Sequence, residues 1–200
     1  TFVRDDPLAA LASNLLQSHL LIGGCHEEAE AEYRRGADLS GSRDVPEHTA
    51  LQRAWEIGDE RLIEERFPLY LANQTIPVPA FHEVYEVRDD RPAVQAILRA
   101  AIDSSWAQRA GMPMSALAWW LGHYGDPESA LAAATRAQLE LQGAAVSWLW
   151  FPSLKEMRRL PGFVALLRRL GLIDYWRSSG DWGEMGHEAQ MQFPGLCEAS

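Results

Sequence analysis

The sequence predicts an all-α protein. Residues that favour helices, such as Ala, Leu, Glu and Arg, are abundant, and apolar residues recur at intervals of three and four. No alternating run of β-branched residues is bounded by turn signals. The 200 residues are 47% hydrophobic and 23% charged, which is enough apolar sequence for a sizeable core. We therefore expect a soluble, folded helical chain.

A repeated spacing divides the chain into helix pairs. The segments GCHEEAEAEYRRG (24–36) and GDPESALAAATRA (125–137) both start with a turn glycine, followed by inward positions five, nine and twelve residues later. Steps of about 34 residues from these glycines reach further breaks between helical stretches. We predict five helix pairs that turn at residues 24, 58, 91, 125 and 159, with inward positions at Ile63 and Phe67 after the second turn and at Ala96 and Ala100 after the third.

This spacing resembles that of the tetratricopeptide repeat (TPR), a helix pair with a period of about 34 residues. The resemblance implies a right-handed superhelix of about five antiparallel pairs, whose first helices line a concave groove. One pair cannot bury its apolar face alone, so neighbouring pairs stack and share a core. Gln17 and Glu83 stand where the family has apolar residues, and Pro68 should kink a second helix. We therefore expect a looser, TPR-like arrangement.

The stretch FPSLKEMRRLPGFVALLRRLGLIDYWRSSGDW (151–182) is similar to the closing segment of bacterial TPR proteins, with its LLxRLGLxDYWR helix end. In that family the repeats often follow a signalling or DNA-binding effector domain, which implies an interaction or sensory module. The last pair of a stack also needs a cap over its open face. We expect Gly171 to end a helix, and Leu172, Ile173, Tyr175 and Trp176 to fold back as this cap, with Leu172 and Trp176 substantially buried. Trp182 stays unassigned.

Charge is unevenly distributed along the chain. Residues 151–180 have a formal charge of about +4, against about −14 for the rest, and the net charge is −10. We expect residues 1–180 to form one helical-repeat domain and residues 181–200 an acidic tail. Basic residues within 155–169 should pair with Asp181, Glu184 and Glu188, at about 0 to 1 kcal/mol for each exposed pair. The acidic surface disfavours nucleic acid as a partner.

Cysteine usage and hydropathy point to the cytoplasm. Cys25 and Cys197 are far apart and have no CxxC spacing, so we expect neither a disulfide framework nor a structural zinc site. No apolar run approaches the ~20 residues of a membrane span, and the first residues are acidic where a signal peptide is basic. We expect no membrane partner and no cofactor.

The TPR resemblance also implies which positions face the groove. They lie about ten, six and three residues before each turn. Aromatic and Arg side chains, which are enriched at binding hot spots, gather in the middle repeats. Packing within the stack is the alternative for Trp55, Phe81, Tyr85 and Trp119, because aromatic residues at helical spacing are common in cores. The candidate partner-binding residues are His48, Gln52, Trp55, Phe81, Tyr85, Arg88, Ser115, Trp119 and His123.

Motifs for catalysis are missing from the sequence. Three histidines precede glutamate, at residues 26, 82 and 187, but none completes HExxH, and neither GxSxG nor a Walker loop occurs. Cys25 beside His26 is interpreted as an ordinary turn cysteine. We therefore predict a non-enzymatic, cytoplasmic scaffold that binds a peptide or partner protein in its concave groove.

Two other functions stay open. A ligand-sensing regulatory module of a longer signalling or transcription-regulatory protein would bind a small anionic or aromatic molecule near Arg88 and His123. An enzyme that uses the His–Glu pairs is the least supported alternative. The sequence also leaves open the identity of the partner and the oligomeric state, with a homodimer among the alternatives.

Overall fold

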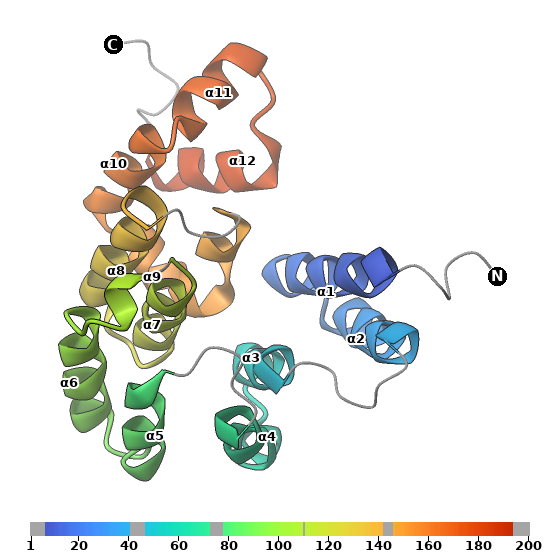
Figure 1. Ribbon diagram of the computed structural model, residues 1–200. Helices are drawn as coiled ribbons and strands as arrows, with labels where there is room; N and C mark the ends of the chain where they lie inside the picture. The colour runs from blue at the N-terminus through green and yellow to red at the C-terminus, as the bar shows by residue number, and fades with distance from the viewer. Residues whose placement is uncertain (1–6, 41–46, 73–77, 110, 142–145, 194–200) are drawn as a thin grey trace. The chain divides into compact units, whose positions relative to one another are not determined.

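The computed structural model describes residues 7–40, 47–72, 78–109, 111–141 and 146–193 (Figure 1). Helices joined by turns make up these segments, and no β-strand occurs in them. The all-α prediction is therefore confirmed. The chain forms two compact units, unit 1 (Thr1–Glu86) and unit 2 (Val87–Ser200). The division falls after Glu86, inside the third of the five expected helix pairs.

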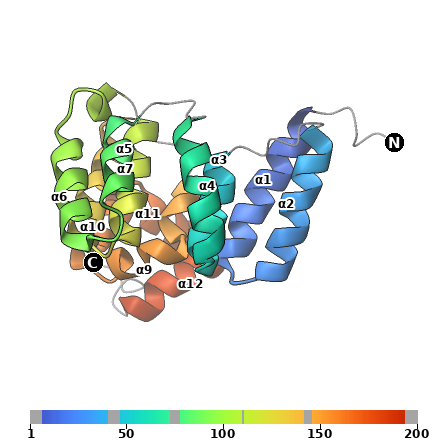
Figure 2. The same ribbon diagram turned by 90° about the horizontal axis from the view of Figure 1, so that it is seen from below.

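Unit 1 is built from neighbouring helices that pack as pairs. They are α1 (Pro7–Ile22), α2 (His26–Ser40), α3 (Glu47–Ile57), α4 (Glu60–Ala72) and α5 (Pro79–Glu86). The structure packs α1 against α2 and α3 against α4, with further contacts of α1 with α3 and of α4 with α5. Figure 2 shows α1 and α2 side by side. Leu51, Ala54 and Phe67 are almost fully buried in the second pair, so their apolar surface holds that pair together.

Unit 2 is arranged around one central helix. Its elements are α6 (Arg91–Ile102), η1 (Ala107–Arg109), α7 (Gly111–His123), α8 (Pro127–Leu139), η2 (Val146–Trp150), η3 (Pro152–Leu154), α9 (Lys155–Arg158), α10 (Pro161–Arg169), α11 (Leu172–Ser179) and α12 (Gly183–Gln192). The central helix is α7, which contacts α6, α8, α9, η1 and η3.

Three turns have the same backbone hydrogen bonds. After α1, the Gly24 N–H donates to the Leu21 carbonyl at 3.1 Å and the Cys25 N–H donates to the Leu20 carbonyl at 2.8 Å. The turns at Gly58, after α3, and at Gly125, after α7, repeat this pattern. All three glycines have a φ of 71° or 72°, a left-handed conformation that a side chain would strain. This Schellman motif caps a helix C-terminus, and it confirms the predicted turns at 24, 58 and 125.

The third and fifth expected turns also separate helices. Asp90 caps α6 by accepting a hydrogen bond from the Ala93 N–H at 3.1 Å. α9 ends at Arg158 and α10 begins at Pro161, so a break surrounds residue 159. The chain thus changes helix at or beside each predicted position. A TPR-like superhelix remains a prediction.

The inward positions of α6 differ from the prediction. Ala96 and Ala100 are exposed. The buried residues of this helix are Val94, Leu98 and Ala101, which stand five, nine and twelve residues after Asp89 rather than after residue 91. The third turn therefore lies two residues earlier than a fixed step of 34 residues places it.

The segment after α10 is helical. Gly171, with a φ of 73°, ends α10 as expected. Trp176 is buried, as predicted, and so is Ile173. Leu172 is only half-buried and Tyr175 is 60% exposed, because positions 173 and 176 share the inner face of α11. Part of the expected acidic tail forms a helix of its own, α12.

Candidate functional site

The central helix of unit 2 leaves one stripe partly accessible. α7 (GMPMSALAWWLGH) has no acidic or basic residue other than its final histidine, and a helix that is apolar on all sides belongs in a core. Leu117, Ala118, Trp120 and Leu121 have no exposed surface. The half-buried residues recur at spacings of three and four and so lie on one face. They are Ser115, Ala116, Trp119, Gly122 and His123, and we call them the α7 stripe.

Gly122 allows η3 to approach α7 closely. A Cβ atom at this position would lie 2.5 Å from Leu154 Cδ2 and 2.9 Å from the Ser153 carbonyl oxygen. Both distances are shorter than van der Waals contact, and the second involves backbone that cannot rotate away. The glycine thus lets η3 form one border of the α7 stripe.

The C-terminal end of the stripe is a closely packed aromatic cluster. The His123 ring lies edge-on to Tyr124, with 5.1 Å between ring centroids, and Tyr124 stacks on Trp120 at 6.4 Å. Burial, and secondarily the positive charge of Arg91, lowers the pKa of His123 from 6.5 to about 4. The imidazole is therefore neutral near pH 7 and offers no positive charge to a ligand.

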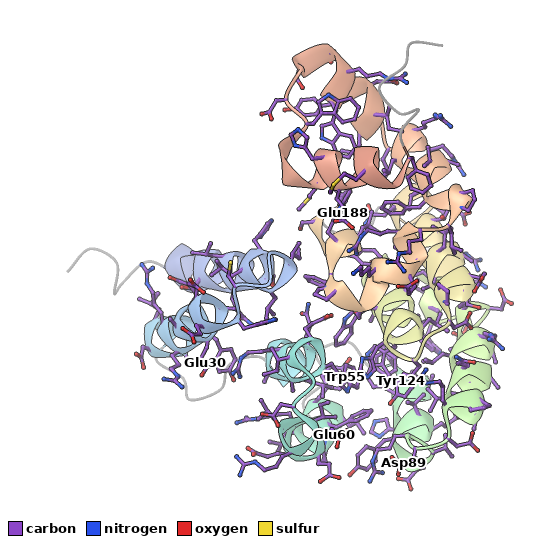
Figure 3. All side chains as sticks on the ribbon, turned by 180° about the vertical axis from the view of Figure 1, so that it is seen from behind. Glu30, Trp55, Glu60, Asp89, Tyr124 and Glu188 are labelled. Atoms are coloured by element: carbon purple, nitrogen blue, oxygen red, sulfur yellow. The ribbon has the colours of Figure 1, made fainter. Side chains whose placement is uncertain are left out.

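Tyr124 is held in its protonated form. Burial raises its pKa to about 12, with a further contribution from the Asp89 carboxylate. Figure 3 labels Tyr124, which directly follows α7, and Asp89, which lies in the turn before α6. Neither Tyr124 nor His123 is thus poised to exchange a proton at neutral pH, which argues against a general acid–base role for this pair.

Side chains of α6 hold the turn that follows α7. Gln95 Nε2 donates to the Tyr124 carbonyl at 2.8 Å, and Arg99 Nε donates to Asp126 Oδ2 at 2.5 Å. Asp126 is 5% exposed and also caps α8 by accepting from the Ser129 N–H at 3.2 Å. The end of the α7 stripe is therefore fixed by polar contacts from a second helix.

The predicted site residues of unit 2 are brought together at this surface. Ser115, Trp119 and His123 lie on the α7 stripe. Ser115 Oγ donates to the Gly111 carbonyl at 2.8 Å, and the Trp119 ring is 6.5 Å from that of Trp120. Arg88 is half-buried, and its charge acts on the Tyr124 hydroxyl at the end of the stripe.

The predicted aromatic residues of unit 1 belong to a ring cluster instead. Trp55 is 6% exposed and Phe81 is fully buried. Trp55 and Tyr85 both pack edge-on against Phe67, at 5.5 and 5.0 Å between centroids, and Tyr85 is half-buried. Edge-on rings of this kind contribute to packing, so Trp55 and Phe81 are core residues and do not form part of the candidate surface.

Gln52 and His48 are the two other predicted site residues of unit 1. Gln52 is half-buried, and its Nε2 is buried without a hydrogen-bond partner among the described residues. His48 belongs to α3, but its side chain lies outside the described part of the structure.

The close contact between Gly122 and η3 was not predicted from the sequence. A glycine inside a helix costs about 1 kcal/mol relative to alanine, so its presence near the end of an otherwise apolar helix was the available signal. The partner element, η3, is too short to have a periodic pattern.

Neither metal-binding nor membrane-spanning features are found in the described segments. These contain no group of three or more His, Cys, Asp or Glu side chains placed to hold a metal ion. None of the described helices combines the length and the hydropathy that crossing a bilayer requires. Comparisons with family models, with curated proteins and with solved structures found no match.

Proposed function

We propose that this chain is a non-enzymatic interaction module that binds a peptide or a segment of a partner protein. In this proposal the α7 stripe forms part of the binding surface. The observation that carries the proposal is the position of Trp119, half-buried on the open face of an otherwise enclosed apolar helix.

Trp119 has the features of a binding hot spot. Tryptophan is enriched at such positions because it combines a large apolar surface with a polar N–H. The ring is bordered along the stripe by Ser115, whose small side chain leaves room for a partner backbone, and by Gly122, against which η3 packs. The underlying helix is fixed by its neighbours, so little ordering entropy would be lost on binding.

A small anionic ligand is less well supported. Such a ligand would be attracted by a positive charge, and His123 is neutral near pH 7 because its pKa is about 4. Arg88 is the remaining cation of the pair that the sequence suggested, and it is half-buried beside Asp89 and Tyr124. We therefore favour a peptide segment over an anionic metabolite.

A random peptide library selected against the intact chain tests this proposal. We expect selected peptides to bind the wild-type chain and to lose about 30-fold in Kd on Trp119→Ala, which corresponds to a hot-spot loss of about 2 kcal/mol. Tyr175→Ala is the matched control, because Tyr175 is an exposed aromatic residue of the same unit. Equal binding by the wild-type and Trp119→Ala chains, both shown to be folded by circular dichroism, would reject the proposal.

A further inference from the structure

A buried arginine connects α12 to the rest of unit 2. Arg158 is 5% exposed. Its Nε donates to Glu188 Oε1 of α12 at 2.8 Å, and its Nη1 donates to the carbonyls of Leu149 and Phe151 at 3.1 and 2.9 Å. Figure 3 labels Glu188 on α12. The two carbonyls fix the guanidinium, so its Nε is aimed at the position that the carboxylate occupies.

The chemistry of this position favours a carboxylate. A buried guanidinium is costly unless an opposite charge compensates it, and its planar donors fit a carboxylate better than any other side chain. The carbonyls of Leu149 and Phe151 accept hydrogen bonds but bring no formal charge. Removal of Glu188 from this place would take away the carboxylate that compensates the Arg158 charge.

An aromatic surface lies beside this position. Trp176 packs edge-on against Trp150, with 6.4 Å between ring centroids, and lies 5.7 Å from the Trp182 ring. A Cβ atom on Gly186 would be 3.2 Å from Trp176 Cδ2, and 3.1 Å from Cβ of Trp182, the residue that precedes α12. The surface therefore accepts a helix whose residue two positions before the carboxylate is very small.

α12 itself is weakly attached. Among its described side chains, the buried ones are the small Gly186 and Ala189, which contribute little apolar area. Met191 is 77% exposed. At the N-terminus of the helix, the exposed Asp181 accepts a hydrogen bond from the Gly183 N–H at 3.1 Å. Gly183 and Gly186 both lower helix propensity. The Glu188–Arg158 ion pair is thus a charged contact that holds α12 in place, beside the packing of Gly186 against Trp176.

We propose that α12 is a displaceable segment and that the surface beneath it is a second binding site, for an acidic helical segment of a partner protein. The partner would place a carboxylate on Arg158 and a small residue over Trp176, as α12 does. Charge complementarity supports an acidic partner, because residues 151–180 have a formal charge of about +4. α12 then acts as an internal competitor that keeps the site closed until the partner binds.

A labelled peptide of residues 183–192 (GEMGHEAQMQ) tests this proposal with the full chain. We expect it to bind the Glu188→Gln chain about tenfold more tightly than the wild-type chain, because the internal segment of that variant has lost its carboxylate. The same peptide carrying Glu188→Gln should bind about tenfold more weakly. The control variant is Glu156→Gln, which removes an exposed pair with Arg159 and should leave peptide binding unchanged. Equal affinity of the peptide for the wild-type and Glu188→Gln chains would overturn the proposal.

Hydrogen exchange of the wild-type chain gives an independent readout if Glu188→Gln fails to fold. Amides of α12 should exchange about tenfold or more faster than those of α10, whose large apolar residues are buried, because α12 opens without global unfolding. Exchange of α12 and α10 at the same rate, through global unfolding, would show that α12 is an integral part of the unit and would contradict the proposal.

Discussion

Trp176 and Tyr175 are neighbours in the sequence with opposite roles. The Trp176 ring is 7% exposed and packs on Trp150, whereas Tyr175 is 60% exposed. We expect Trp176→Ala to lower the free energy of unfolding by about 3–5 kcal/mol, as core truncations do. Tyr175→Ala should change it by less than about 0.5 kcal/mol. Urea denaturation of both variants measures the difference, and similar losses would contradict this placement of α11.

Gly122 and Gly162 differ in what an added Cβ atom would meet. Gly122→Ala forces a Cβ against the Ser153 carbonyl and Leu154, while the nearest atom to a Cβ on Gly162 is the end of the Leu131 side chain, at 2.9 Å. We expect Gly122→Ala to destabilise the chain by about 1–3 kcal/mol through overpacking. Gly162→Ala should cost less, because the Leu131 side chain can rotate. Thermal unfolding monitored by circular dichroism checks the order of the two variants.

His123 makes folding stability depend on pH. Its pKa is about 4 in the folded chain, below the ordinary value of 6.5, owing first to burial and then to Arg91. As the pH falls from about 6.5 to 4, the unfolded chain binds the proton first, so stability is lost across this window by at most about 1.4 kcal/mol per pH unit. Other groups titrate in the same range, so the informative quantity is the difference between variants. His123→Gln should lose less stability between pH 7 and pH 5 in urea titrations, and an unchanged loss would show that His123 is not the cause.

At the level of elements, Asp59 and Asp126 have equivalent positions in two turns but different hydrogen-bond and ion-pair partners. Asp59 follows Gly58 and caps α4 by accepting from the Leu62 N–H at 3.0 Å. Asp126 follows Gly125 in the same way but is buried and also pairs with Arg99. Equivalent positions in two similar turns thus differ by one ion pair.

Substitution of Asp59 and Asp126 separates the contribution of an N-cap to stability from that of the Arg99 ion pair. Asp59→Ala should cost about 1 kcal/mol, the typical value of a lost N-cap. Asp126→Ala should lower the free energy of unfolding by about 2–4 kcal/mol. It removes the cap and also leaves the Arg99 guanidinium and polar groups of the buried turn without their hydrogen-bond partner. Denaturant titrations of both variants measure this, and equal losses would show that the Arg99 pair contributes nothing to stability.

The turns were predictable from the sequence, whereas the registers of some helices were not. Glycine marks a left-handed helix end, so the turns at 24, 58 and 125 could be located from residue type and spacing. The third turn has Asp89 and Asp90 in place of glycine, and a uniform period then misplaced the inward face of α6 by two residues. In α11 a shift of one residue moved burial from Leu172 to Ile173, because each residue turns a helix by about 100°.

At the level of the whole molecule, the division into two units was not predictable from the repeat. The helix spacing is continuous through Glu86, while the units are defined by long-range packing. Charge differs between them: unit 1 has 16 Asp or Glu against 7 Lys or Arg, a formal charge of −9, and unit 2 accounts for the remaining −1. Such an asymmetry steers charged partners to different parts of the chain.

The candidate site was predictable only in part, because burial of its aromatic residues depends on tertiary packing. The repeat spacing located Ser115 and Trp119 on the open face of α7, because the turn at Gly125 fixes the register of that helix. The same projection selected Trp55 and Phe81, which are buried. An apolar ring has the same sequence signature in a core and at a binding surface, so tertiary packing alone separates the two cases.

The most direct test of the account is a hydrogen-exchange footprint of the intact chain with a peptide selected to bind it. We predict that the bound peptide slows exchange of the amides of α7, around Ser115 to His123, and that Trp119→Ala abolishes this protection while Tyr175→Ala retains it. Protection that falls on other elements and leaves α7 unchanged would contradict the assignment of the α7 stripe as a binding surface.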